Sequence, residues 1–244
     1  MGCPMTIKKS VSIILPVHNE KDSIEKVILS VYENVYAKLD DGEFIVAEDG
    51  STDGTREILE RLRKEYPIKL VSTNKRKGYS RAVRDALSLA SKEVVFFLDS
   101  DAQHKDSDFW KLWPFIEDFD IVTGYKCPRT DPAFRLFISR VMNTLNFFMF
   151  GCFFRDINSG FKLFRGPSLT LLLSKYEGLD FISTELLLKA FLLKMRIAEV
   201  PVLHYKRKYG ESRGLPASVL PLKISRLVFG LFKIRLRLLF KHKM

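Results

Sequence analysis

Short apolar runs and amphipathic stretches alternate over the first half of the chain. The run from Val11 to Val17 is rich in β-branched residues and closed by polar ones, which is typical of a buried strand. Over residues 22–36, apolar side chains recur at helical spacing instead. The alternation continues with strands predicted over 43–47, 68–72, 94–98 and 121–124, and helices over 53–66 and 80–91. This order predicts an α/β domain with a Rossmann-like, mostly parallel sheet flanked by helices.

Three of the predicted strands end on polar residues, over 16–20, 48–51 and 99–101. Ligands of such sheets bind beyond the carboxyl ends of the strands, so we expect these segments to meet in one crevice. The apolar run VVFFL ends directly on Asp99 and Asp101, although ionised carboxylates are costly to bury without a partner. This placement favours a divalent cation, Mg²⁺ or Mn²⁺, held by Asp99 and Asp101 with Gln103 as a further oxygen ligand.

Beyond residue 125 the pattern changes to longer apolar stretches broken by polar residues, over 134–154 and 222–240. Neither is apolar enough for a membrane span, which needs about 20 apolar residues. On a helix, the second stretch has a basic face and an apolar face, formed by Lys223, Arg226, Lys233, Arg237 and Lys241 and by Leu227, Leu231, Ile234 and Leu238. The pattern favours a helix in the plane of a membrane surface, and the alternative is an amphipathic helix packed on the core.

The net charge of +11 is concentrated at one end of the chain. Residues 201–244 hold eleven Lys or Arg and one acidic residue, a net charge of +10, which leaves +1 for the first 200 residues. Such a segment predicts a partner with phosphates, either nucleic acid or an anionic membrane. The three cysteines are widely spaced, and no secretion signal is evident, so we expect a reduced, intracellular setting.

Five motifs occur in a fixed order: PVHNE, AEDGSTDGT, NKRKGYSRA, DSD and RDINSGFKLFR. Together they resemble the family 2 glycosyltransferases of the GT-A fold. The resemblance implies that the first three motifs and Ser100 hold the donor nucleotide, through Pro16, His18, Glu20, Glu48, Asp49, Lys77, Gly78 and Ser100. It also implies that Asp99 and Asp101 carry the metal and the diphosphate. Glu48 stands where the second motif often has another Asp.

The second half is similar to the dolichyl-phosphate mannosyltransferase branch of that family. The matching residues lie in Thr123–Lys126, Arg135 to Asn143, Arg155–Lys162 and residues 199–213. By this resemblance the acceptor phosphate is bound by Lys126, Arg135, Ser139, Asp156, Ser159, Arg207 and Arg213. Arg135 and Arg207 join Asp99 and Asp101 as catalytic candidates. Ser159 and Gly160 would let the backbone approach the substrate closely, and the role of Glu185 is open. The Gln-x-x-Arg-Trp motif of polysaccharide synthases is absent after Glu185, which disfavours polymer synthesis.

A phosphate acceptor suits this set of cations. A lipid phosphate is largely dianionic at pH 7 and needs no general base, unlike a hydroxyl acceptor. Together with the resemblance, this leads us to expect metal-dependent, inverting transfer of mannose from GDP-mannose to dolichyl or another polyprenyl phosphate, with UDP-glucose or another UDP-hexose as the alternative donor. The expected enzyme lies peripherally on the cytosolic membrane face, with residues 1–214 as the catalytic domain and 215–244 as a membrane-associating tail. A membrane-spanning partner subunit would fit this arrangement. Hydroxyl-acceptor transfer and nucleic-acid binding are the competing hypotheses, and the apolar stripe of the tail disfavours nucleic acid.

Overall fold

A computed structural model describes residues 10–128, 133–205 and 220–241. Its strands are β1 Ser10–Val17, β2 Asp41–Asp49, β3 Ile68–Thr73, β4 Val94–Leu98, β5 Ile121–Lys126, β6 Phe161–Arg165 and β7 Ile197–Val202. Its helices are α1 Ile24–Asn34, α2 Thr55–Leu62, α3 Tyr79–Leu87, α4 Phe109–Leu112, α5 Ala133–Phe150, α6 Gly166–Ser174, α7 Ile182–Leu192 and α8 Leu220–Lys241. Short 3₁₀ turns lie at Tyr36–Lys38 (η1), Asp106–Asp108 (η2) and Trp113–Phe115 (η3).

The seven strands form one sheet in the order β3-β2-β1-β4-β6-β5-β7. Every neighbouring pair is parallel except the two that involve β6, which runs antiparallel between β4 and β5. The predicted α/β class and mostly parallel sheet are therefore confirmed. The first five strands lie where the apolar runs predict them, whereas β6 and β7 have no counterpart among the predicted strands.

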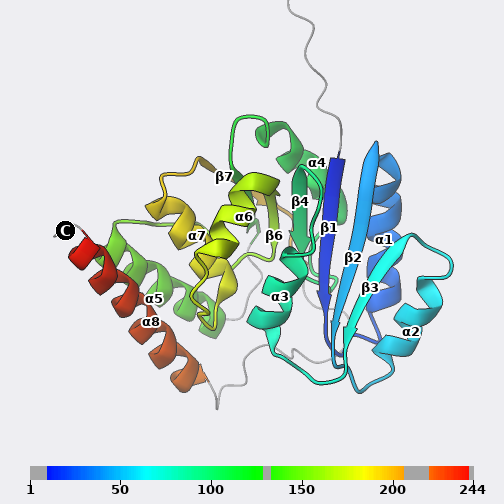
Figure 1. Ribbon diagram of the computed structural model, residues 1–244, viewed down its shortest axis with the longest axis horizontal. Coiled ribbons are helices and arrows are strands. Elements are labelled where there is room, and N and C mark those ends of the chain that lie inside the picture. Colours follow the sequence, from blue (N-terminus) through cyan, green and yellow to red (C-terminus); the bar gives the residue numbers. More distant parts are fainter. Residues whose placement is uncertain (1–9, 129–132, 206–219, 242–244) are drawn as a thin grey trace, which may run out of the picture.

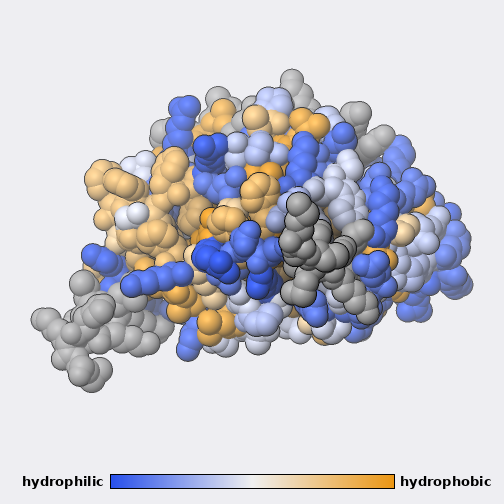
Figure 2. All heavy atoms as spheres, turned by 90° about the horizontal axis from the view of Figure 1, so that it is seen from above, coloured by the Kyte–Doolittle hydropathy of each residue, from blue (hydrophilic) through white to orange (hydrophobic). Residues whose placement is uncertain are grey.

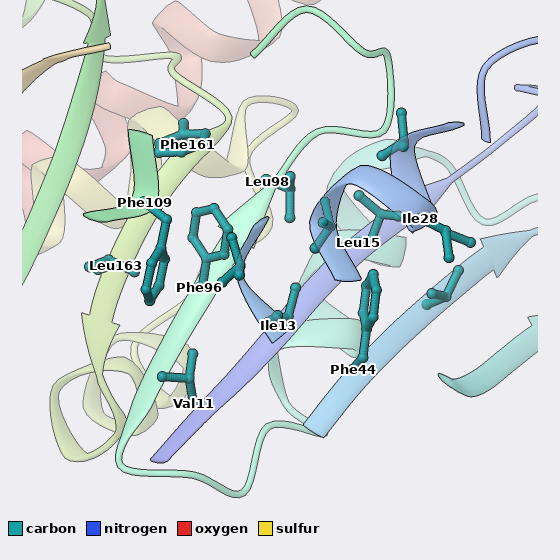
Figure 3. Packing of buried hydrophobic residues seen from close by; sticks show 14 of the residues in the cluster. Val11, Ile13, Leu15, Ile28, Phe44, Phe96, Leu98, Phe109, Phe161 and Leu163 are labelled. Carbon is teal, nitrogen blue, oxygen red and sulfur yellow. The ribbon is translucent and has the colours of Figure 1, made fainter. Parts of the chain in front are cut away.

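Helices cover both faces of the sheet, giving three layers (Figure 1). Helices α1, α2 and α4 pack on one face, over a core that includes Ile13, Phe44, Phe96 and Phe161 (Figure 3). Helices α3, α6, α7 and α8 pack on the other face, together with Met142 of α5. Successive side chains of β1 point to opposite faces of the sheet, so the strand contributes to both cores. Ile13 packs in the first core and Ile14 in the second.

The start of α2 differs from the sequence expectation. The sequence predicts this helix from residue 53, but it begins at Thr55 with Gly54 before it at φ +96°. Asp53 still contributes, because its Oδ1 accepts hydrogen bonds from the Thr55 amide at 3.1 Å and the Thr55 hydroxyl at 2.5 Å. Asp53 therefore satisfies an amide at the start of α2 from outside the helix.

The packing of helix α8 supports the second of the two alternatives for the basic tail, an amphipathic helix packed on the core. Leu227, Leu231 and Ile234, from the predicted apolar stripe, are buried in the second core. Gly230 completes the contact, because a Cβ there would collide with the Leu179 side chain. These three residues of the stripe pack on the protein. The expectation that they face a membrane is therefore wrong. Among the described helices, none is both long and apolar enough to cross a membrane.

Candidate active site

The first two polar strand ends are joined by hydrogen bonds beyond β1 and β2. The His18 ring lies with Nδ1 2.8 Å from the Asp49 carbonyl oxygen, to which it donates. The Asn19 amide donates to Ser51 Oγ at 2.9 Å, and Asn19 Oδ1 accepts from the Thr52 amide at 2.7 Å. The Glu20 amide donates to Thr55 Oγ1 at 2.8 Å. The first and second motifs therefore form one hydrogen-bonded wall, and Pro16 lies in β1 just before it.

Asp49 connects this wall to the third motif. Its Oδ1 accepts from the Lys77 amide at 2.7 Å, and its Oδ2 accepts from the Gly78 amide at 3.0 Å. Gly50 has φ +63°, and a Cβ there would lie 2.7 Å from the Arg76 nitrogen, so only glycine fits this turn. The Lys77 ammonium pairs with Asp85 at 2.9 Å. The structure thus joins the Asp49 carboxylate to the backbone amides of Lys77 and Gly78, and the role of all three toward a nucleotide stays a prediction.

Glu48 is directed into the protein. Its carboxylate is fully buried and accepts hydrogen bonds from the Ser51 amide and from the Arg56 guanidinium at 2.9 and 2.7 Å. Arg56 also donates to the Thr73 carbonyl of β3. These contacts brace the turn between β2 and α2. A direct role of Glu48 toward the nucleotide stays a prediction.

The aspartate pair at the end of β4 divides into two environments. The Tyr79 hydroxyl donates to Asp99 Oδ1 at 2.7 Å, and the Asp99 amide donates to the Gly160 carbonyl at 3.0 Å. Burial raises the pKa of Asp99, and the Tyr79 hydrogen bond and the nearby Lys162 and Lys126 oppose this rise. Asp101 instead accepts from the Gln103 amide at 3.2 Å within its own loop. Ser100, between them, is buried.

Gln103 is held in place by the segment that follows β7. Its side-chain amide donates to the Tyr205 carbonyl at 3.1 Å, and the Tyr205 amide donates back to the Gln103 carbonyl at 2.7 Å. His104 and His204 form an isolated β-bridge beside this pair, with their rings 5.1 Å apart. With its nitrogen used in this way, Gln103 has its side-chain oxygen as the atom suited to a cation.

These oxygen atoms fit a cation that is shared with a substrate. Within the described residues, no group of three or more His, Cys, Asp or Glu side chains is arranged to hold a metal without a substrate. Mg²⁺ and Mn²⁺ accept one or two carboxylates completed by water and phosphate oxygens. Asp99, Asp101 and Gln103 carry oxygen atoms of that kind, and their binding of a metal stays a prediction.

A second group of buried polar residues lies beside Asp99, on the same face of the sheet. Asp156, Ser159 and Lys162 are all less than 4% exposed. The Ser159 carbonyl accepts from the Lys162 ammonium and from the Ser183 hydroxyl of α7. Burial lowers the pKa of Lys162 to about 8, although Asp156 and Asp99 both oppose this effect. Lys126, at the end of β5, also acts electrostatically on Asp99 and Lys162.

Helix α5 contributes buried polar groups that have no hydrogen-bond partner among the described residues. The Ser139 hydroxyl and the Asn143 side-chain oxygen are buried, and neither has a hydrogen-bond partner in the part of the chain described. The Asn143 nitrogen donates to the Phe154 carbonyl at 2.6 Å, which ties α5 to the segment that precedes Asp156. Buried hydroxyls without partners are uncommon, so Ser139 is a candidate ligand of a bound polar group.

The family model for "Glycosyl transferase family 2" matches residues 12–169, which include the three polar strand ends and the loop at Asp156. The chain belongs to glycosyl transferase family 2. Among curated proteins it is 26% identical, over 208 residues, to an undecaprenyl-phosphate 4-deoxy-4-formamido-L-arabinose transferase of Salmonella choleraesuis (strain SC-B67). That match covers 84% of this chain and 62% of the relative, so the chain spans about three fifths of the length of the curated relatives it matches.

Solved structures of similar fold agree with the GT-A expectation. Glucosyl-3-phosphoglycerate synthase from Mycobacterium tuberculosis, in complex with Mn²⁺, UDP and glucosyl-3-phosphoglycerate, aligns with a TM-score of 0.68 at 23% identity. The alignment covers 93% of this chain and 80% of the other. A mannosyltransferase from Pyrobaculum calidifontis, in complex with GDP-Man and Mn²⁺, aligns with a TM-score of 0.67 at 22% identity, over 95% of this chain and 65% of the other. These likenesses show the GT-A fold.

Three predicted arginines have no described side chain. Arg207 and Arg213 lie outside the described residues, and Arg135 is described only as a position on α5. Tyr205, which is bonded to Gln103, precedes Arg207 by two positions in the sequence. The roles of all three arginines stay predictions.

Two residues beside Asp99 escaped the sequence reasoning, namely Tyr79 and Lys162. Both lie inside quoted motifs, and Lys162 stands out as a charge within the apolar run FKLFR of β6. That run could have been recognised as a buried strand containing a cation. Glu185, whose role was open, accepts from the Glu177 and Leu179 amides and pairs with Lys189, so it stabilises the loop before α7.

Proposed function

We propose that this protein transfers a hexose from a nucleoside diphosphate sugar to the phosphate of a polyprenyl lipid. The observation that carries the proposal is the pairing of β4 with β6. It places the DSD motif directly against the DINSG loop, with the Asp99 amide bonded to the Gly160 carbonyl. Donor-side and acceptor-side candidates from distant parts of the sequence therefore share one end of the sheet.

On the donor side, the wall formed by His18, Asn19 and Asp49 would bind the nucleotide. The third-motif loop at Lys77 and Gly78 would close over it, held by Asp49. A divalent cation bound at Asp101 and Gln103 would neutralise charge on the departing diphosphate. We propose GDP-mannose as the donor, with UDP-glucose or another UDP-hexose as the alternative. The structural neighbours bound to UDP and to GDP-Man support a nucleotide donor, and they do not distinguish uracil from guanine as its base.

On the acceptor side, the reaction would require cations to bind the phosphate and would not require a general base. A phosphate monoester is largely dianionic at pH 7, so one of its oxygens can attack the anomeric carbon without losing a proton. The new bond joins that oxygen to the sugar, and the bond between the anomeric carbon and the nucleoside diphosphate breaks. Attack opposite the leaving group inverts the anomeric centre. Lys126, Arg135, Arg207 and Arg213 would balance the phosphate charge, and Ser139 would donate a hydrogen bond to it.

The lipid acceptor requires a route from a membrane, and the surface around α5 and α8 offers one. Phe147, Phe148, Phe153, Phe229 and Phe232 are each more than half exposed. Hydrophobic residues gather at the end of the molecule that carries α5 and α8 (Figure 2, with Figure 1). Exposed basic residues of α8, such as Arg226, Lys233 and Arg235, lie among them and suit anionic headgroups. We propose peripheral binding to the cytosolic face, with or without a membrane-spanning partner subunit.

The experiment is a transfer assay on detergent-purified protein. GDP-mannose, UDP-glucose and UDP-N-acetylglucosamine are each offered with dolichyl or undecaprenyl phosphate, in Mg²⁺, in Mn²⁺ and in chelator. The proposal expects metal-dependent lipid labelling from one donor, with inversion seen by NMR of the product. If a nucleotide binds but no lipid phosphate is labelled, the acceptor is wrong, and a small phosphorylated or hydroxyl acceptor takes its place. Binding of RNA or DNA without nucleotide-sugar binding would contradict the enzyme assignment altogether.

A further inference from the structure

Gly160 is a glycine because of its surroundings and not because of its backbone. It is absent from the residues with positive φ, so a side chain would meet no conformational strain there. A Cβ built on Gly160 would instead fall far inside the contact distance of Asp99 Oδ2 and Cγ, and 2.8 Å from Oδ1. The space that another residue would fill is occupied by the Asp99 carboxylate.

Two other residues act on the same carboxylate, one by a hydrogen bond and one electrostatically. The Tyr79 hydroxyl donates to Oδ1 at 2.7 Å from the first turn of α3. Lys162, in β6, is 1% exposed; its ammonium donates to the carbonyl of Ser159, the neighbour of Gly160, and acts electrostatically on Asp99. In the β4–β6 register, Lys162 pairs with Phe97, so its side chain lies on the face that also carries Asp99, two residues further along β4.

We infer that Gly160, Tyr79 and Lys162 form a seat that fixes the Asp99 carboxylate in one orientation before the donor binds, and that all three are positioning residues. This inference rests on the proposed function for the role of Asp99 at the diphosphate. It replaces the expectation that Gly160 is small to admit the substrate. A carboxylate held by a packed surface and a hydrogen bond, in the field of a buried cation, needs no reorganisation when the reaction begins.

The first test is a stability cycle that needs no substrate. Gly160→Ala is made in the wild type, in Asp99→Asn and in Asp99→Ala, and melting temperatures are compared. Asn retains the volume that collides with the new methyl group, whereas Ala removes it. We expect Gly160→Ala to lower the melting temperature by a few °C in the wild type and in Asp99→Asn, and by less than about 1 °C in Asp99→Ala. An equal loss in all three backgrounds would overturn the seat.

The second test measures metal binding, by titration of free Mn²⁺ by EPR in the presence of GDP or UDP. Gly160→Ala should weaken Mn²⁺ binding by about 10–100-fold, and saturating-substrate turnover by a similar factor. The matched control is Gly124→Ala in β5, where a Cβ would lie 2.8 Å from Val202 Cγ1 and would not touch Asp99. The control should retain Mn²⁺ affinity. Wild-type affinity in Gly160→Ala, or equal losses in the two variants, would overturn the inference.

The two proposals fail in different ways. If the wild-type protein binds no Mn²⁺–nucleotide complex, the proposed function is wrong, and the stability cycle alone decides whether the seat exists. If the wild type binds the complex and the cycle shows no dependence on the residue at position 99, the function stands and the seat does not.

Discussion

The hydroxyl of Tyr79 lies 2.7 Å from Oδ1 of Asp99, and this hydrogen bond joins the first turn of α3 to the end of β4. Burial of the hydroxyl and the negative charge of Asp99 raise the pKa of Tyr79 well above its usual value, so the phenol remains a donor throughout the physiological range. A loop from the third motif is thereby connected to the aspartate pair.

Tyr79→Phe removes this donor and keeps the ring. We expect turnover at saturating donor to fall about 10-fold or more, because Asp99 loses a partner that orients it. The melting temperature should change by a few °C at most. Steady-state kinetics and thermal unfolding measure both quantities. Tyr36→Phe is the control, since its hydroxyl donates to the Gly42 carbonyl at the opposite end of the sheet. Equal kinetic effects of the two variants would contradict the role of Tyr79.

Asp101→Asn should abolish metal-dependent turnover and leave the fold intact, because this side chain lies in the loop after β4, where it accepts a hydrogen bond from the Gln103 amide at 3.2 Å. Asp108→Asn provides the reverse case. Asp108 is 2% exposed, accepts from the Leu203 amide at 2.6 Å and pairs with Lys111 at 3.0 Å. It should lose about 1–3 kcal/mol of stability and retain turnover per folded molecule. Full activity of purified Asp101→Asn would refute the metal role.

The Glu48–Arg56 pair should matter for stability more than an exposed pair does. Arg56→Met leaves the fully buried Glu48 carboxylate with the Ser51 amide, and we expect a loss of about 3 kcal/mol, or roughly 6–12 °C in melting temperature. Arg61→Met breaks the pair with Glu25, whose side chains are about half exposed, and should cost less than about 1 kcal/mol. Chemical denaturation of the two variants tests this ranking, and similar losses would argue against it.

Asp106 gives the folded state a dependence on pH. Burial raises the pKa of Asp106 from 3.8 to about 6, although a hydrogen bond from Ser30 opposes the rise. The folded protein therefore binds this proton more tightly than the unfolded chain, so this group's contribution to stability falls as the pH rises from about 4 to about 6. Asp106→Asn should remove that slope and stabilise the protein by about 1–3 kcal/mol at pH 7. Unfolding curves between pH 4 and pH 7 provide the measurement, and an unchanged slope would be the contrary result.

Phe148 and Phe229 provide a test of membrane binding, because they are 80% and 72% exposed. The double variant Phe148→Ser/Phe229→Ser should reduce flotation with liposomes that contain anionic lipid by about 10-fold or more. Phe115→Ser is the control, since Phe115 is also exposed but lies in η3, among the elements of the other face of the sheet. Flotation that is lost equally in the control, or retained in the double variant, would place the membrane contact elsewhere.

The sequence by itself determined the elements whose physics is local. Alternating apolar runs were enough for the first five strands and for α1 to α3, because a buried strand and an amphipathic helix have distinct periodicities. The meeting of the polar strand ends at one edge of the sheet also followed from the sequence, because neighbouring parallel strands have their carboxyl ends on the same side. The five motifs, taken together, indicate the glycosyl transferase family 2 to which the chain belongs.

Tertiary structure alone decided what depends on contacts between distant residues. The insertion of β6 antiparallel between β4 and β5 sets Gly160 and Lys162 beside Asp99, and nothing in a run such as FKLFR states its neighbour or its direction. The sequence also predicts Glu48 as a polar strand end available to a ligand, but its carboxylate is paired with Arg56. It predicts Leu227 on a lipid-facing stripe, but this side chain is buried in the protein. Periodicity shows that a face is apolar or charged, whereas packing decides what that face contacts.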